Sequence, residues 1–178
     1  EGKCWRCNSP VVKKKLEQWF FRITDYAQEL LDDLDQLPGW PERVRIMQRN
    51  WIGRSEGARL TFTAKELGEE IETFTTRFDT IFGVTFLALA PEHPHVDTIL
   101  EKASNKEELE TFVKTCISQS EIDRTAVGGE KNGVFTGFYA TNPATGEDVP
   151  IWIANYILMD YGTGAIMGVP AHDERDFD

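Results

Sequence analysis

Apolar and polar residues follow a helical period in the first part of the chain. Over residues 15–37 the apolar positions lie three and four apart, so they share one face of a predicted helix. Thr24 and Asp25 are good capping residues, and they leave open a division of this range into two shorter helices. A Pro-Gly pair ends the pattern, and a further short helix is predicted over residues 42–50.

From residue 58 the pattern changes to the alternation that is typical of β-strands. Runs that alternate or are uniformly apolar predict strands over residues 58–64, 69–77, 83–90, 134–140, 149–157 and 165–169. The first two are separated by a turn and form a predicted hairpin. Helices are predicted within residues 93–118, with Cys116 on an apolar face, and at residues 172–176. Many strands with inserted helices indicate an α+β fold with a mixed or barrel-like sheet.

The charge divides the chain where the pattern changes. Residues 1–57 carry a net charge of +1 and residues 58–178 one of −12, which together give the −11 of the whole chain. We therefore predict a helical linker region over residues 1–57 and a separate acidic domain over residues 58–178. The acidic balance argues against tight nonspecific binding of nucleic acid, because such binding depends on Lys and Arg.

The cysteines are too few for a disulfide framework, since the chain has three among 178 residues. This favours a reducing cytoplasm. Cys4 and Cys7 form a lone Cys-x-x-Cys, whereas a closed zinc site needs four ligands, so we expect no metal bound by this chain alone. His93 and His95 flank a proline at a predicted helix start, where surface positions are expected. No apolar run is long enough for a membrane span.

Two polar clusters are candidates for chemistry. The first, Thr73 to Thr80, lies where a predicted strand ends and side chains leave the core. The second runs from Tyr161 through a Gly-rich loop to an acidic stretch, in which Asp173 and Asp176 would share one helix face. Each cluster is also explained by structure alone, through the strand preference of threonine or helix capping by acids. Phosphate-binding loops, dinucleotide-binding glycine motifs and the nucleophile elbow of hydrolases are absent from the sequence.

Three stretches resemble the editing domain that is inserted into bacterial-type leucyl-tRNA synthetases. They are WPERVRIMQRNWIGRSEGA (40–58), FTTRFDTIFGVTFLALAPEHP (74–94) and ILMDYGTGAIMGVPAHDERDFD (157–178), in the order and spacing of that family. The resemblance covers essentially the whole chain. It implies a β-barrel-like editing domain with peripheral helices, preceded by a helical linker segment. The family's domain continues beyond Asp178, so the resemblance also implies a domain truncated at its C-terminal end.

The activity that this resemblance implies is hydrolysis of the ester joining a wrong amino acid to the terminal adenosine of tRNA(Leu). Isoleucyl- and norvalyl-tRNA are the implied substrates, and leucine is excluded. A second, hydrolytic site is needed because a single pocket distinguishes side chains that differ by one methylene by only about 1–3 kcal/mol. The implied partners are the 3′ end of tRNA(Leu) and the rest of the synthetase. The domain itself needs no cofactor, the parent enzyme uses ATP and Mg²⁺, and the implied location is the cytoplasm, with no membrane partner.

The family motifs assign roles to residues of both clusters. Thr80 is expected to block the branched end of leucine, and Thr75 and Thr76 to contact the ester and the terminal adenosine. Asp176 is expected to bind the α-ammonium through a charge-assisted contact. Arg77 is expected to hold the terminal nucleotide or neighbouring aspartates. The remaining assignments are Asp173 among the catalytic residues, and Tyr161 and Met167 among the substrate-binding ones.

One position departs from the family motif. Phe78 stands where the family has proline, whose ring would fix the turn before Asp79 and Thr80, so the placement of Thr80 is open. Two alternatives remain. The editing domains of isoleucyl- and valyl-tRNA synthetases share the fold and similar motifs. An inactive fragment that only binds aminoacyl-tRNA or a protein partner belongs to a different class.

Overall fold

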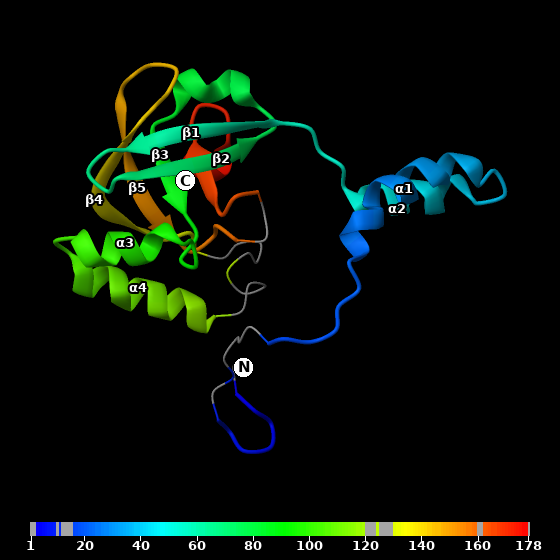
Figure 1. The fold of residues 1–178 in the computed structure, drawn as a ribbon, viewed down its shortest axis with the longest axis horizontal. Coiled ribbons are helices and arrows are strands. Elements are labelled where there is room, and N and C mark those ends of the chain that lie inside the picture. Colours follow the sequence, from blue (N-terminus) through cyan, green and yellow to red (C-terminus); the bar gives the residue numbers. More distant parts are fainter. Residues whose placement is uncertain are drawn as a thin grey trace. The chain divides into compact units, whose positions relative to one another are not determined.

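The computed structural model describes residues 3–9, 11, 16–119, 124, 130–159 and 162–177. The chain forms two compact units, one of Lys13–Glu56 and one of Glu1–Val12 together with Gly57–Asp178. Figure 1 shows the smaller unit as a pair of helices and the larger as a curved sheet with helices beside it. Within the described residues, all strands belong to the larger unit.

The smaller unit is a helical hairpin. Its elements are η1 (Ile23–Tyr26), α1 (Ala27–Asp33), η2 (Leu34–Gln36) and α2 (Glu42–Ile52), where η denotes a 3₁₀ helix. The predicted second helix is therefore confirmed, but the predicted start of the first helix at residue 15 is wrong, because residues 16–22 are not helical. Trp19, Phe20 and Phe21 are exposed there. A periodic apolar stripe stabilises a helix only when it packs against something, and of this stripe Leu34 is buried whereas Ile23 and Leu30 are exposed.

The ends of α1 and α2 are tied together within this unit. Arg49 of α2 forms an ion pair with Asp35 of η2. Gly53 ends α2 with φ at +61°, and its N–H donates to the Arg49 carbonyl at 2.9 Å. A left-handed residue at this place favours glycine, which explains Gly53 at the end of this helix.

Six strands of the described chain form one mixed sheet. They are β1 (Ala58–Ala64), β2 (Glu69–Thr75), β3 (Phe86–Leu89), β4 (Gly133–Thr141), β5 (Asp148–Ala154) and β6 (Ala165–Gly168). The hydrogen-bonded order is β2-β1-β4-β5-β3-β6, in which only β3 and β5 run parallel. The outermost strands β2 and β6 also approach each other, so the sheet curls toward a barrel, which confirms the predicted fold class.

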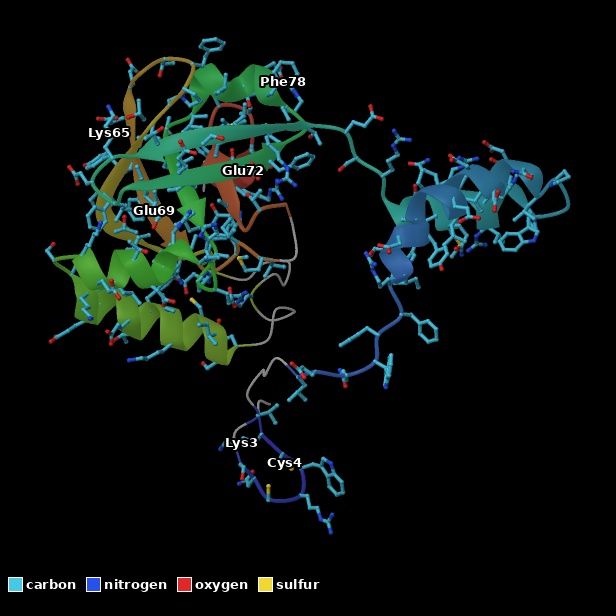
Figure 2. All side chains as sticks on the ribbon, in the orientation of Figure 1. Lys3, Cys4, Lys65, Glu69, Glu72 and Phe78 are labelled. Carbon is cyan, nitrogen blue, oxygen red and sulfur yellow. The ribbon has the colours of Figure 1, made fainter. Side chains whose placement is uncertain are left out.

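A 3₁₀ helix lies between β2 and β3, and both strands are shorter on this side than predicted. η3 (Phe78–Gly83) follows β2 after two residues, and β3 starts only at Phe86 instead of at residue 83. Thr80 and Ile81 of η3 are buried, whereas Phe78 and Phe82 are exposed. Figure 2 shows Phe78 projecting from this helix. The strand pattern of the sequence conceals η3 because its apolar residues are divided between core and surface.

The sheet contains a bulge in β4. The pairing of β4 with β5 shifts register between Phe135 and Tyr139, and Gly137 adopts φ of +85° at this place. The Thr136 hydroxyl donates to the Ile151 carbonyl at 2.7 Å and thereby satisfies a buried acceptor of β5 beside the bulge. A glycine with positive φ is typical of such bulges, which increase the local twist that a barrel needs.

Two helices complete the core of the larger unit. α3 (His95–Lys102) and α4 (Lys106–Ser118) pack against each other, and α4 contacts β4 (Figure 1). Cys116 is buried on α4 as predicted, and burial raises the pKa of its thiol. The largest fully buried apolar side chains of the described strands and helices are Phe62, Ile71, Leu87, Leu89, Ile99, Leu109, Ile151 and Ile153.

The expected surface position of His93 is wrong. Its ring is buried, because the turn after β3 folds back so that the His93 N–H donates to the Ala90 carbonyl. Nδ1 of His93 accepts from the His95 N–H at 3.2 Å. Burial, and secondarily the charge of His95, lowers the pKa of His93 to about 4, so this histidine is a neutral core residue.

The last described helix is α6 (Glu174–Phe177), which lies within the predicted helical stretch at the end of the chain. Most of the polar segment at residues 120–129 lies outside the described residues. None of the helices in the described part of the chain is long and apolar enough to cross a membrane.

Candidate functional site

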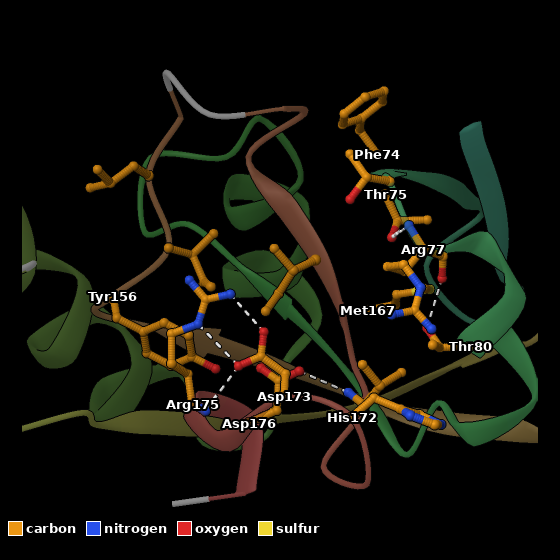
Figure 3. Close-up of a pocket in the computed structure, with 15 residues that line it drawn as sticks. Phe74, Thr75, Arg77, Thr80, Tyr156, Met167, His172, Asp173, Arg175 and Asp176 are labelled. Atoms are coloured by element: carbon orange, nitrogen blue, oxygen red, sulfur yellow. Dashed lines mark hydrogen bonds and ion pairs between the residues drawn. The ribbon is translucent and has the colours of Figure 1, made fainter. Parts of the chain in front are cut away.

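A cavity of about 410 Å³ in the larger unit brings the two polar clusters together (Figure 3). Its volume lies in the range of small-ligand sites. The residues that line it are Phe74, Thr75, Thr76, Arg77, Thr80, Tyr156, Ile157, Leu158, Ile166, Met167, Val169, His172, Asp173, Arg175 and Asp176. We call Thr75, Thr76, Arg77 and Thr80 the threonine wall, and Asp173, Arg175 and Asp176 the aspartate wall. Figure 3 shows labelled members of the two walls on opposite sides of the cavity.

The threonine wall is shaped by the turn between β2 and η3. The Arg77 N–H donates to Oγ1 of Thr75 at 3.0 Å, so Thr75 fixes the backbone at the end of the strand. The Arg77 guanidinium forms two hydrogen bonds with the Asp79 carboxylate, at 2.9 and 2.8 Å. These bonds lower the pKa of Asp79 and raise that of Arg77. Both side chains are largely exposed, so the pair is a feature of the cavity's rim.

Thr80 is held by its own turn. Its N–H and its hydroxyl both donate to the Arg77 carbonyl, at 3.1 and 2.8 Å, and only 4% of the residue is exposed. The hydroxyl is therefore engaged inside η3. Phe78 replaces the proline of the family motif, yet the turn still forms, because hydrogen bonds that do not involve Phe78 close it.

The aspartate wall is shaped by the start of α6. Oδ1 of Asp173 accepts from the Arg175 N–H at 2.9 Å, which is the contact of a helix-capping residue. The Arg175 side chain also forms two bonds with the same carboxylate, at 3.0 and 2.6 Å. Hydrogen bonds from Arg175 lower the pKa of Asp173, so this carboxylate is ionised and neutralised by its neighbour.

Asp176 differs from Asp173 in its surroundings. Oδ2 of Asp176 accepts from the Val169 N–H at 2.8 Å, and the residue forms no ion pair with another described residue. Burial, and then the charge of Asp173, raises the pKa of Asp176, an effect that the Val169 bond partly offsets. Asp176 is therefore a half-buried carboxylate at the cavity that forms no short-range ion pair with another described residue, and Arg175 and Lys131 act on it only through their more distant charges. A ligand with a positive charge would supply a direct ionic contact.

The family model described as leucyl-tRNA synthetase, editing domain, matches residues 49–178. The chain belongs to this family. The match excludes the alternative assignment to an isoleucyl- or valyl-tRNA synthetase.

Leucyl-tRNA synthetase relatives match the chain over its whole length. Leucine–tRNA ligases of Symbiobacterium thermophilum and Thermotoga maritima are each 58% identical, over 100% and 99% of this chain. A solved structure with 44% identity and a TM-score of 0.79 covers 99% of the chain; it is a ternary complex of a LeuRS from Agrobacterium radiobacter K84 with tRNA and LeuAMS. The chain spans 21% of the length of each of these proteins.

Most residues that the sequence places in an editing site lie around the cavity. Met167 of β6 lines it and is buried, and Thr76 lines it on the threonine wall. Tyr161 lies outside the described residues. The structure thus places seven of the eight predicted site residues in one cavity: Thr75, Thr76, Arg77, Thr80, Met167, Asp173 and Asp176.

Sequence reasoning missed other residues that line the cavity of this editing domain. Tyr156 follows β5, packs on a small cluster of alanines and Ile157, and has its pKa raised to about 12, mainly by burial. His172 and Arg175 belong to the predicted acidic cluster but received no role. Their closeness in sequence to the aspartates was the only indication that His172 and Arg175 belong to the site. The sequence contains no comparable indication for Tyr156.

The described residues contain no cluster of three or more His, Cys, Asp and Glu side chains that could hold a metal ion. Cys4 and Cys7 are free thiols in a short turn, in which the Asn8 N–H donates to the Cys4 carbonyl. Hydrogen bonds from Ser9 lower the pKa of the Cys7 thiol.

Proposed function

We propose that this editing domain hydrolyses the ester bond of mischarged tRNA(Leu), with isoleucyl- and norvalyl-type substrates accepted and leucyl-tRNA excluded. The observation that carries the proposal is the cavity itself, in which a half-buried carboxylate without an ion pair to any described residue faces a wall of threonines. An aminoacyl ester carries a cationic ammonium next to its carbonyl, and this arrangement of charge suits it.

Asp176 binds the α-ammonium of the substrate. The backbone N–H of Val169 holds one carboxylate oxygen, which orients the group toward the cavity and leaves the other oxygen for the ligand. A charge-assisted hydrogen bond in a partly buried site fixes the ester with a defined orientation. Asp173 is bonded to Arg175, so it contributes chiefly to the position of α6, and its charge still acts on Asp176, whose pKa it raises.

Thr80 excludes leucine by its bulk. Its hydroxyl is engaged with the Arg77 carbonyl and the residue is almost fully buried, so the side chain forms a stiff part of the wall. A close-packed wall rejects a side chain that is branched at the wrong carbon without offering any attractive contact. Met167, also buried at the cavity, completes this apolar side.

The hydrolysis needs only a positioned water. The described lining contains no Ser, Cys or Lys that would act as a nucleophile. The water oxygen attacks the ester carbonyl, the bond from that carbon to the ribose oxygen breaks, and the ribose oxygen takes a proton, which yields free amino acid and tRNA. In this proposal Thr75, Thr76 and the Arg77 side chain, which line the cavity, contact the ester and the terminal adenosine. Stabilisation of the developing oxyanion by such donors is a large contribution to catalysis in acyl transfer.

The partners follow from this function. The 3′ end of tRNA(Leu) enters the cavity, and the remaining four-fifths of the synthetase delivers it, together with the ATP- and Mg²⁺-dependent aminoacylation that this chain does not perform. These steps take place in the cytoplasm. The boundary between a linker over residues 1–57 and the editing domain over residues 58–178 is part of the same proposal.

Deacylation assays test the function directly. Isoleucyl-, norvalyl- and leucyl-tRNA(Leu) are incubated with the chain itself and with a full-length leucyl-tRNA synthetase that carries it. We expect loss of the first two esters and survival of the third. Binding without hydrolysis of any ester in both preparations would favour the alternative of an inactive binding module.

A further inference from the structure

A buried asparagine that is distant in sequence from the site contacts η3. Asn142 follows β4 directly and is 1% exposed. Its side-chain Nδ2 donates to the carbonyl of Ile81 at 2.9 Å, across 61 positions of sequence. Ile81 is the neighbour of Thr80. The same carbonyl accepts a longer bond, at 3.4 Å, from the Val84 N–H, so Asn142 supplies its shorter bond.

Asn142 is itself held in place by the turn that it starts. Its Oδ1 accepts from the Ala144 N–H at 2.9 Å, its N–H donates to the Glu147 carbonyl at 2.8 Å, and its carbonyl accepts from the Gly146 N–H at 2.8 Å. The backbone N–H, the backbone carbonyl and both side-chain polar atoms of Asn142 are thus bonded. A buried amide in a complete network has one orientation, so it fixes the position of whatever it holds.

η3 needs an external restraint because it is short and partly exposed. It comprises six residues, and two of its aromatic side chains, Phe78 and Phe82, face solvent. The bonds of Thr80 to Arg77 hold the turn together internally, but they do not determine where the turn lies relative to the sheet. A 3₁₀ helix of this length has little stability of its own.

We propose that Asn142 is a positioning residue for leucine exclusion: its bond to Ile81 fixes η3 against the end of β4 and so keeps Thr80 in the wall of the cavity. This rests on the proposed function, because it acts through Thr80. Asn142 itself does not line the cavity and touches no substrate. It determines which side chains enter, and not whether the ester reacts.

Three variants test the proposal in the full-length synthetase and in the chain. Asn142→Asp keeps the shape and the acceptor for the Ala144 N–H, and its ionised form has no proton to donate to the Ile81 carbonyl. Asn142→Ala removes both contacts. The control, Thr145→Ala, removes a bond within the same turn, from the Glu147 N–H to the Thr145 hydroxyl, and leaves the contact with η3 intact.

We expect both Asn142 variants to hydrolyse leucyl-tRNA about fivefold faster than the parent, the effect of one lost hydrogen bond, with isoleucyl-tRNA hydrolysis changed much less. Thr145→Ala should match the parent. Phe78→Pro, at the first position of η3 where proline suits a helix, should restrain the turn and restore leucine exclusion in the Asn142→Ala background.

The outcomes separate this inference from the proposed function. A parallel Thr80→Ala variant that still spares leucyl-tRNA would overturn the steric role of Thr80 and, with it, the role of Asn142. If Thr80→Ala hydrolyses leucyl-tRNA but neither Asn142 variant does so, the positioning role of Asn142 alone is overturned. An equal fall in hydrolysis of all three esters, together with a lowered melting temperature, would make Asn142 a merely structural residue.

Discussion

The two walls of the cavity are held by different means. The threonine wall is a turn whose hydrogen bonds are mostly neutral and whose key side chain, Thr80, is nearly inaccessible. The aspartate wall is a helix start whose side chains are charged and partly exposed, with Asp173 and Asp176 under opposite pKa shifts. Packing thus decides the properties of one wall, and charge those of the other.

Under the proposed function, this difference assigns the two tasks of an editing site to separate structures. Shape discriminates between side chains that differ by a methyl position, whereas charge recognises the ammonium that all aminoacyl esters share. A change in the aspartate wall should therefore affect every substrate, and a change in the threonine wall should affect the choice among substrates.

The largest effect is expected from Asp176→Ala. Loss of a charge-assisted contact is worth about 2–3 kcal/mol, which is on the order of 100-fold in rate, and isoleucyl- and norvalyl-tRNA should be affected alike. Deacylation rates of the parent and the variant measure this. Glu174→Ala, at an exposed neighbour that does not line the cavity, is the matched control and should retain the parent rate. Undiminished hydrolysis by Asp176→Ala would remove this carboxylate from the site.

Removal of the Thr80 methyl group should change selectivity by about tenfold or more, since steric exclusion is lost when this group leaves the wall. Thr80→Ala and Thr80→Ser both lack that methyl group, so both should hydrolyse leucyl-tRNA while they still clear isoleucyl-tRNA. Thr80→Val keeps the shape and loses the hydroxyl, so it should still exclude leucine. Half-lives of leucyl-tRNA distinguish the three variants. If Thr80→Val hydrolyses leucyl-tRNA and Thr80→Ser does not, the hydroxyl of Thr80 and not its bulk excludes leucine.

The sequence predicted the parts of this site that depend on local pattern. The β1–β2 hairpin, its end near Thr75 and the acidic start of a helix follow from alternation and from capping preferences. The family motifs then identified Thr80 and Asp176. The two walls meet only because β6 pairs with β3 and curls toward β2. Such pairings between distant segments cannot be predicted from the pattern of any single stretch of sequence.

The errors have equally local physical causes. His93 lies beside a proline at a helix start, which suggested the surface, yet a tight turn places its ring in the core. The sequence did not predict η3, because a 3₁₀ turn with both buried and exposed apolar residues resembles the end of a strand. Asn142 lies between two predicted strands, and nothing in the sequence indicates that its amide reaches Ile81.

A smaller effect is expected in the pH dependence of Asp173→Asn. The Asp173 charge raises the pKa of Asp176, and an acid must be ionised to bind the ammonium as a charge pair, so activity falls as the pH drops through that pKa. Removing the charge lowers the pKa of Asp176. The acidic limb of the deacylation profile should therefore move to lower pH in Asp173→Asn. A limb that stays in place or moves upward would show that Asp173 does not act on Asp176 electrostatically.

The smallest effect is expected from Tyr156→Phe. Its ring packs on Ala88, Ala90, Ala154 and Ile157, and phenylalanine preserves that packing. The hydroxyl lies near the aspartate wall, as the influence of Asp176 and Asp173 on its pKa indicates, but it forms no hydrogen bond to another described residue. If ionic binding of the ammonium rests on Asp176, loss of this hydroxyl should change deacylation by less than about threefold, the effect of a weak neutral contact. Side-by-side rates and melting temperatures of the parent, Tyr156→Phe and Asp176→Ala check this. A tenfold fall with an unchanged melting temperature would instead make the hydroxyl a second anchor for the substrate, and the aspartate wall would then depend on more than charge.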